Sequence, residues 1–134
     1  MEKLELFSQE WAQAAGQNLQ TSTGYQKAAA TWEGTMIFAN SSQTNSNAFF
    51  DLWHGECCAA RLATPTDLEN AAYIISADAS TWEQVLTGKL EPIAALLRGK
   101  LKLSKGNLAV LVRYVPAAKE LVLCAANVPT IFPT

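Results

Sequence analysis

The segment from Ile74 to Tyr114, IISADASTWEQVLTGKLEPIAALLRGKLKLSKGNLAVLVRY, holds most of the signals that decide the fold. Within it, the run Ser80-Thr-Trp-Glu83 matches a capping box, in which the serine oxygen and the glutamate satisfy two backbone amides, and predicts a helix that starts there. Gly88 can adopt the left-handed conformation that ends helices at low cost. The segment therefore contains a short helix that is followed by a glycine turn.

The rest of the segment predicts a second helix, a strand and a third helix. Pro92 suits the first position of a helix, and Gly99 ends that helix in the same way as Gly88. Residues 100–103 alternate between polar and apolar, which is typical of a half-buried strand. Asn107 is a good cap for a helix that we expect to end at Pro116.

Flanking regions add helices on both sides. Residues 117–127 fit a helix, although 121–124 also suit a strand, and we favour the helix. Apolar residues recur every three or four positions over 4–19, which predicts an amphipathic helix. The composition of 30–39 favours a strand.

A meander of short strands is predicted in between. Residues 40–47 are rich in Asn and Ser and predict a surface loop. Residues 49–54 and 57–63 form two strands joined by a tight turn. Residues 64–67 break the chain again, and 71–77 form a further strand.

Several of these residues resemble the distal half of sterol carrier protein type 2 domains. They are Asp78 to Trp82, Val85-Leu86, Gly88, Pro92 to Ala94, Gly99 to Leu103 and Lys105 to Leu108. The order and spacing of helix, glycine turn, helix, Gly-Lys-Leu strand and Gly-Asn turn are similar to those of that family. Upstream, 49–63 and 71–78 look like the second to fourth strands of the family.

The resemblance implies an α+β fold with one domain over 1–134. It implies a five-stranded twisted mixed sheet, covered on one side by helices and enclosing an apolar tunnel for a fatty acid, acyl-CoA or sterol-like molecule. The parts are an N-terminal helical region (1–29), the strand meander (30–77), two short helices (78–98), and a fifth strand with C-terminal helices (99–134). The resemblance brings no catalytic residue.

Composition narrows the function. Hydrophobic residues make up 49% of the chain and charged residues 16%, against about 25% in an average protein. A formal net charge of -2 gives no basic excess for a phosphate backbone, so nucleic acid is not an expected partner. We expect a lipid or another apolar small molecule as the partner, with at most transient contact with a membrane surface.

The cysteines and the N-terminus predict a cytoplasmic protein. Cys57, Cys58 and Cys124 show no CxxC spacing, so neither a disulfide framework nor a metal site is predicted, and no cofactor is expected. Acidic residues stand within 1–10, where a signal peptide would need a basic start. The apolar stretches are far shorter than the ~20 residues that cross a bilayer.

The candidate ligand-binding residues are apolar, because an internal lipid site needs concave apolar surface rather than a motif. They come from the predicted strands and covering helices, and core packing is an alternative role for each. They are Phe38, Phe50, Leu52, Trp82, Leu97, Leu101, Leu103, Leu108, Leu111 and Val115.

Reactive side chains are few. His54 is the sole histidine and lies at a predicted turn, where a surface role is expected. Cys57 and Cys58 are adjacent in a strand, so their side chains point to opposite faces. Asp51 alternates with Phe50 and its other apolar neighbour, so it faces solvent if they face the core. No catalytic residue is assigned.

Five of the ten basic residues lie between 89 and 105, namely Lys89, Arg98, Lys100, Lys102 and Lys105. Two interpretations stay open for them. They form a solvated strand face, or they steer an anionic headgroup, a CoA phosphate or a membrane surface toward the mouth of the cavity.

Two other classes of function stay open beside lipid binding. One is a small isomerase or hydrolase that uses Asp51, Asp78 or His54 in an apolar pocket, where burial raises a carboxyl pKa. The other is an interaction domain that docks a partner helix or forms a homodimer through an apolar groove.

Overall fold

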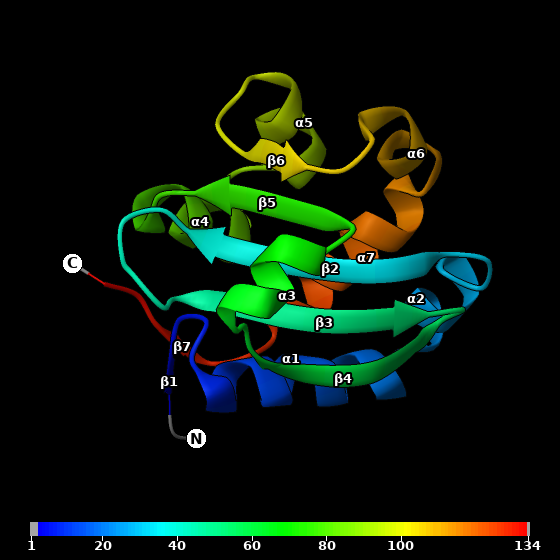
Figure 1. The fold of residues 1–134 in the computed structure, drawn as a ribbon, viewed down its shortest axis with the longest axis horizontal. Coiled ribbons are helices and arrows are strands. Elements are labelled where there is room, and N and C mark those ends of the chain that lie inside the picture. The colour runs from blue at the N-terminus through cyan, green and yellow to red at the C-terminus, as the bar shows by residue number, and fades with distance from the viewer. Residues whose placement is uncertain (1–2, 134) are drawn as a thin grey trace.

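The computed structural model describes residues 3–133; the expected domain limits at residues 1 and 134 lie outside that range. Within it, five strands form one sheet in the order β4-β3-β2-β5-β6 (Figure 1). The strands are β2 (Glu33–Asn40), β3 (Asn47–Trp53), β4 (Glu56–Leu62), β5 (Tyr73–Ala77) and β6 (Lys102–Lys105). In this sheet only the β2–β5 pair is parallel, so the sheet is mixed, and the expected α+β fold is confirmed.

Helices pack mainly on one face of this sheet. They are α1 (Gln9–Thr21), α2 (Thr23–Ala28), α3 (Pro65–Asn70), α4 (Ala79–Leu86), α5 (Pro92–Leu97), α6 (Leu108–Arg113) and α7 (Val115–Ala126). In Figure 1, α1, α4 and α7 lie behind the sheet, whereas α3 lies in front of it. Two short strands, β1 (Leu4–Glu5) and β7 (Thr130–Ile131), pair in parallel and join the two ends of the chain.

The alternation of side chains along β2 separates two cores. Met36 and Phe38 are buried in the main core under the helices. Ile37 points to the other face, where it packs with Phe49 and Ala71 beneath α3. Most helices therefore cover one face of the sheet, and only α3 covers part of the second face.

Two helix starts differ from the prediction. The Ser80 capping box does not form, because α4 begins earlier: the Asp78 carboxylate accepts a hydrogen bond from the Thr81 amide at 2.8 Å. A capping box does form at Thr64 and Asp67, where we expected only a chain break. Pro65 then occupies the first turn of α3, and this turn chemistry starts a helix of six residues.

Other boundaries are shifted. The first helix begins at Gln9 rather than at residue 4, because Leu4 pairs with Thr130 in the small sheet. The fifth strand runs over β6 rather than over 100–103. The last predicted helix is confirmed as α7, but Pro116 lies in its first turn instead of ending α6. Proline is tolerated there because the first amides of a helix have no partner within it.

Candidate functional site

An apolar void lies between the sheet and the helices that cover it. Its lining residues come from β2, β5, α4, α5, α6, α7 and the turn before β6. They are Met36, Phe38, Ile75, Trp82, Pro92, Ile93, Leu96, Leu101, Leu111, Ala118, Leu121 and Val122. None of these side chains is ionisable. The position therefore suits an apolar molecule.

Local structure fixes the walls of this void. Trp82 is fully buried on α4, and its indole Nε1 donates a hydrogen bond to the Ala39 carbonyl at 2.9 Å. That bond satisfies the polar atom of Trp82 and leaves its ring against Phe38, with ring centroids 5.0 Å apart. The α5 helix forms the wall opposite the sheet. At its start the Glu91 carboxylate accepts a hydrogen bond from the Ala94 amide at 2.7 Å.

The void is too small for a lipid in this structure. Its volume is about 20 Å³, enough for about one water molecule. Pockets that hold organic ligands enclose about 300 Å³ or more. The tunnel expected from the family resemblance is therefore closed here, and a lipid enters only if part of the wall moves.

A second hollow adjoins the void from outside. It is an apolar groove of about 380 Å³ between α7 and the turn that joins α4 to α5. Its residues are Val85, Gly88, Leu90, Glu91, Pro92, Lys119, Glu120, Val122, Leu123 and Ala126. Pro92 and Val122 line both the groove and the void, so they form a shared wall. The groove is the side from which we expect a ligand to enter the void.

The α5 and α6 helices are the walls with few buried residues, and α5 is the one that also borders the groove. Ala95 is its only buried residue. Gly88 and Gly99 flank the segment that carries it, and their φ angles of +82° and +76° lie in the left-handed region that favours glycine. A Glu91–Lys119 ion pair at 4.0 Å is an exposed contact between the start of α5 and α7, and such pairs contribute little.

The ten predicted ligand-binding residues fall into three groups. Phe38, Trp82, Leu101 and Leu111 are among the residues that line the void. Phe50 and Leu52 are buried in the same core away from it, while Leu103 and Val115 are half-buried. Leu97 and Leu108 are 75% and 48% exposed, and they lie outside the lining of this closed form.

Sequence reasoning missed Ile93 and Leu96 as lining residues. Both are apolar residues of the second helix predicted in the segment, as is Leu97, which was the candidate chosen. One residue along a helix turns the side chain by about 100°, so α5 directs Leu96 inward and Leu97 outward. Ala118 and Leu121 were missed because the segment after Pro116 had no firm assignment. The helical spacing of Ala118, Leu121 and Val122 was the available signal.

The reactive side chains lie away from the void. Phe50 and Leu52 are buried, so Asp51 between them faces the opposite side of the sheet. His54 is exposed in the β3–β4 turn, where its Nε2 lies 2.9 Å from Glu33 Oε2. Cys57 is buried and Cys58 exposed, as their adjacency predicted.

Burial raises the pKa of the Cys57 thiol to about 11, which leaves it a poor nucleophile. Within residues 3–133, no cluster of three metal-ligating side chains is found. No helix in that range is long and apolar enough to span a bilayer.

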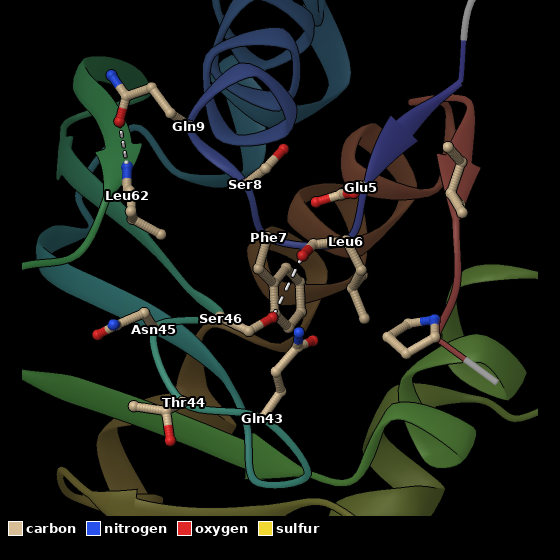
Figure 2. A pocket seen from close by; sticks show the side chains of 12 residues that line it. Glu5, Leu6, Phe7, Ser8, Gln9, Gln43, Thr44, Asn45, Ser46 and Leu62 are labelled. Atoms are coloured by element: carbon tan, nitrogen blue, oxygen red, sulfur yellow. Dashed lines mark hydrogen bonds between the residues drawn. The ribbon is translucent and has the colours of Figure 1, made fainter.

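A polar pocket of about 360 Å³ lies at the start of α1 (Figure 2). The Ser46 hydroxyl donates to the Leu6 carbonyl at 3.2 Å, and Gln9 Oε1 accepts from the Leu62 amide at 2.7 Å. The Phe7 ring packs edge-on against Trp11 and Trp82. The Ser46 hydrogen bond links the turn after β1 to the loop between β2 and β3, and the Gln9 hydrogen bond links α1 to β4.

Fold and site together define an α+β domain with an apolar interior site under a lightly supported helical cover. The model of the SCP-2 sterol transfer family matches residues 13–119. The chain belongs to this family. No curated protein matches it at a significant level.

Solved structures agree with this assignment. A crystal structure of sterol carrier protein 2 is 42% identical, with a TM-score of 0.84, and covers 92% of this chain and 99% of its own. A conserved hypothetical protein from Thermus thermophilus, described as possibly a sterol carrier protein, is 39% identical, with a TM-score of 0.82 and coverage of 100% and 96%. Sterol carrier protein 2 from Yarrowia lipolytica, in its apo form, shares the fold at 18% identity, with a TM-score of 0.60 and coverage of 93% and 97%.

Proposed function

We propose that this protein binds one apolar, lipid-like molecule between its sheet and α5, carries it, and catalyses no reaction. The supporting observation is the void, whose lining is wholly apolar and which the outer groove adjoins. Membership of a sterol transfer family supports the same function. The ligand classes are fatty acids, acyl-CoAs and sterol-like molecules.

Binding requires α5 to move away from α7. Ile93 and Leu96 close the void from above, while Pro92 and Val122 separate it from the groove. An incoming acyl chain replaces the contacts that α5 loses with its own apolar surface. Burial of that surface contributes about 25 cal/mol per Å², which favours the open form once a lipid is present.

The small-enzyme alternative has less support. It requires an acid or a histidine in the apolar site. Neither Asp51 nor His54 lines that site, and Asp78 caps the start of α4. A homodimer, a cytoplasmic location and the lack of a nucleic-acid partner stay predictions from the sequence.

An Ala118→Leu variant tests the site. Ala118 lines the void, so a larger side chain occupies the space that the ligand needs. Overpacking of this kind costs about 1–3 kcal/mol, and we expect binding to weaken by about 5- to 150-fold. The measurement is titration with a fluorescent acyl probe, followed by displacement with fatty acids, acyl-CoAs and sterols.

Ala109→Leu is the matched control, because Ala109 is exposed on α6 and outside the lining. Circular dichroism checks that both variants are folded. Equal probe affinity for Ala118→Leu and the wild type would place the ligand elsewhere. Absence of probe binding to the wild type, with no displacement by any of the three ligand classes, would contradict the proposed function.

A further inference from the structure

Positive charge is concentrated in one part of the chain. Between residues 89 and 113 lie six of the ten basic residues and one of the twelve acidic ones, Glu91. The basic residues are Lys89, Arg98, Lys100, Lys102, Lys105 and Arg113. This segment carries a formal charge of +5, whereas the whole chain carries -2. The charge asymmetry is therefore strong.

These charges are available to a partner. All six side chains are exposed. Among residues 3–133, none of them forms a salt bridge, and the one acid of the segment, Glu91, pairs with Lys119. The Lys105 ammonium donates a hydrogen bond to the Glu69 carbonyl. Asp78 lines a pocket with Lys100 and Lys102 without a salt bridge to either, so this surface keeps an excess of positive charge.

Apolar side chains stand exposed in the same segment. Leu97 ends α5, Leu108 begins α6 and Val112 lies one turn further; they are 75%, 48% and 54% exposed. None of them lines the void or the groove. Figure 1 shows α5 and α6 at one edge of the molecule, on either side of β6. Basic and apolar groups thus share this edge.

We propose that this edge, formed by α5, β6 and α6, docks on an anionic phospholipid surface. Anionic lipids attract basic residues, each contributing about 1 kcal/mol, and exposed leucine and valine side chains enter the boundary between headgroups and acyl chains. The inference rests on the proposed function. An acidic protein is the less fitting partner, because the exposed apolar residues lie at helix ends rather than in a groove.

Docking and ligand exchange share one element. The inner side of α5 closes the void through Ile93 and Leu96, and its outer side presents Leu97. Docking at this edge therefore places the helix that closes the void against the lipid surface.

Sedimentation with vesicles tests the docking edge. We expect binding to vesicles of phosphatidylcholine mixed with phosphatidylserine, little binding to phosphatidylcholine alone, and weaker binding as salt rises. Lys100→Gln with Lys102→Gln should weaken binding about 25-fold, because each lysine contributes about fivefold. Lys3→Gln with Lys27→Gln makes the same change of charge elsewhere and should have little effect.

Val112→Ser tests the apolar contribution and should weaken vesicle binding about fivefold. Ile131→Ser is its control, because Ile131 is similarly exposed, at 50%, on β7. Equal losses in the two lysine pairs, or no binding to anionic vesicles, would overturn the docking edge. Retention on polyglutamate without vesicle binding would overturn it in favour of an acidic protein.

The acyl-probe titration in solution separates the two proposals. We expect the lysine variants to bind the probe as the wild type does. If the wild type binds the probe but no vesicle, the docking edge fails and the proposed function stands. If it binds anionic vesicles but no probe, the proposed function fails.

Discussion

Asp67 shows how one carboxylate stabilises two features. It accepts hydrogen bonds from the Arg61 guanidinium on β4, and it accepts the Thr64 amide hydrogen bond that closes the capping box of α3. The hydrogen bond from Arg61, followed by those from Thr64, lowers the pKa of the Asp67 carboxyl from 3.8 to about 2. The ionised carboxylate is thus favoured in the folded state.

This shift predicts how stability depends on pH. The folded-state pKa lies below the unfolded value, so the contribution is fully present above about pH 4 and is lost as the pH falls toward 2. Asp67→Asn should lower the free energy of unfolding by about 1 kcal/mol at pH 6, a modest value because the Arg61 side chain is 39% exposed. Urea unfolding at pH 6 and pH 2 measures the difference.

Glu69→Gln is the matched control, because Glu69 is exposed on the same helix. It should unfold at the same urea concentration as the wild type. A deficit in Asp67→Asn that persists unchanged at pH 2 would contradict the role of the ionised carboxylate.

At the scale of single residues, the sequence predicted orientation well where the period was clear. Cys57 and Cys58 face opposite ways, and Asp51 faces away from the core, because strands alternate strictly. The choice between Leu96 and Leu97 was not predictable, since both lie within the broad apolar face of a short helix. Only the packing of α5 against α7 and the sheet decides which side chain points inward.

At the scale of elements, α5 is expected to open more readily than the central strands of the sheet. It has one buried residue, whereas β2 is hydrogen-bonded on both sides, to β3 and β5. Segments with few buried contacts open at lower free energy. Hydrogen exchange read by mass spectrometry should show faster exchange of the α5 amides than of the β2 amides.

A bound fatty acid should change the amide exchange rates of α5. It should leave the amide exchange rates of β4, the strand at the opposite edge of the sheet from β6, unchanged. Protection of α5 equal to that of β2, with no response to fatty acid, would contradict the opening of this helix.

Capping signals identified helices but not always their places. Thr64-Pro-Thr-Asp67 was interpreted as a break, although the same residue types start helices, because nothing apolar with helical period follows them. Ser80 satisfied the pattern of a capping box, but Asp78 lies two residues earlier and caps α4 first. Two overlapping cap patterns compete, and burial of Ala79 favours the earlier one.

At the scale of the whole molecule, the family resemblance, strongest over 74–114, was enough to predict a five-stranded mixed sheet with helical cover, and this is confirmed. The pairing of β1 with β7 was not predictable, because each strand has two residues and no period. The size of the void could not be predicted either, because it depends on small differences in packing among α5, α7 and the sheet. The sequence showed that the interior is apolar, but not that it is closed.

The central claim is that the apolar interior accepts one lipid molecule. Native mass spectrometry of gently purified protein, incubated with a fatty acid, measures this most directly. We expect the wild type to gain the mass of one ligand per chain. Ala118→Leu should lose this gain, and Ala109→Leu should show the same gain as the wild type. A wild-type spectrum that shows only the bare chain with fatty acids, acyl-CoAs and sterols alike would contradict it.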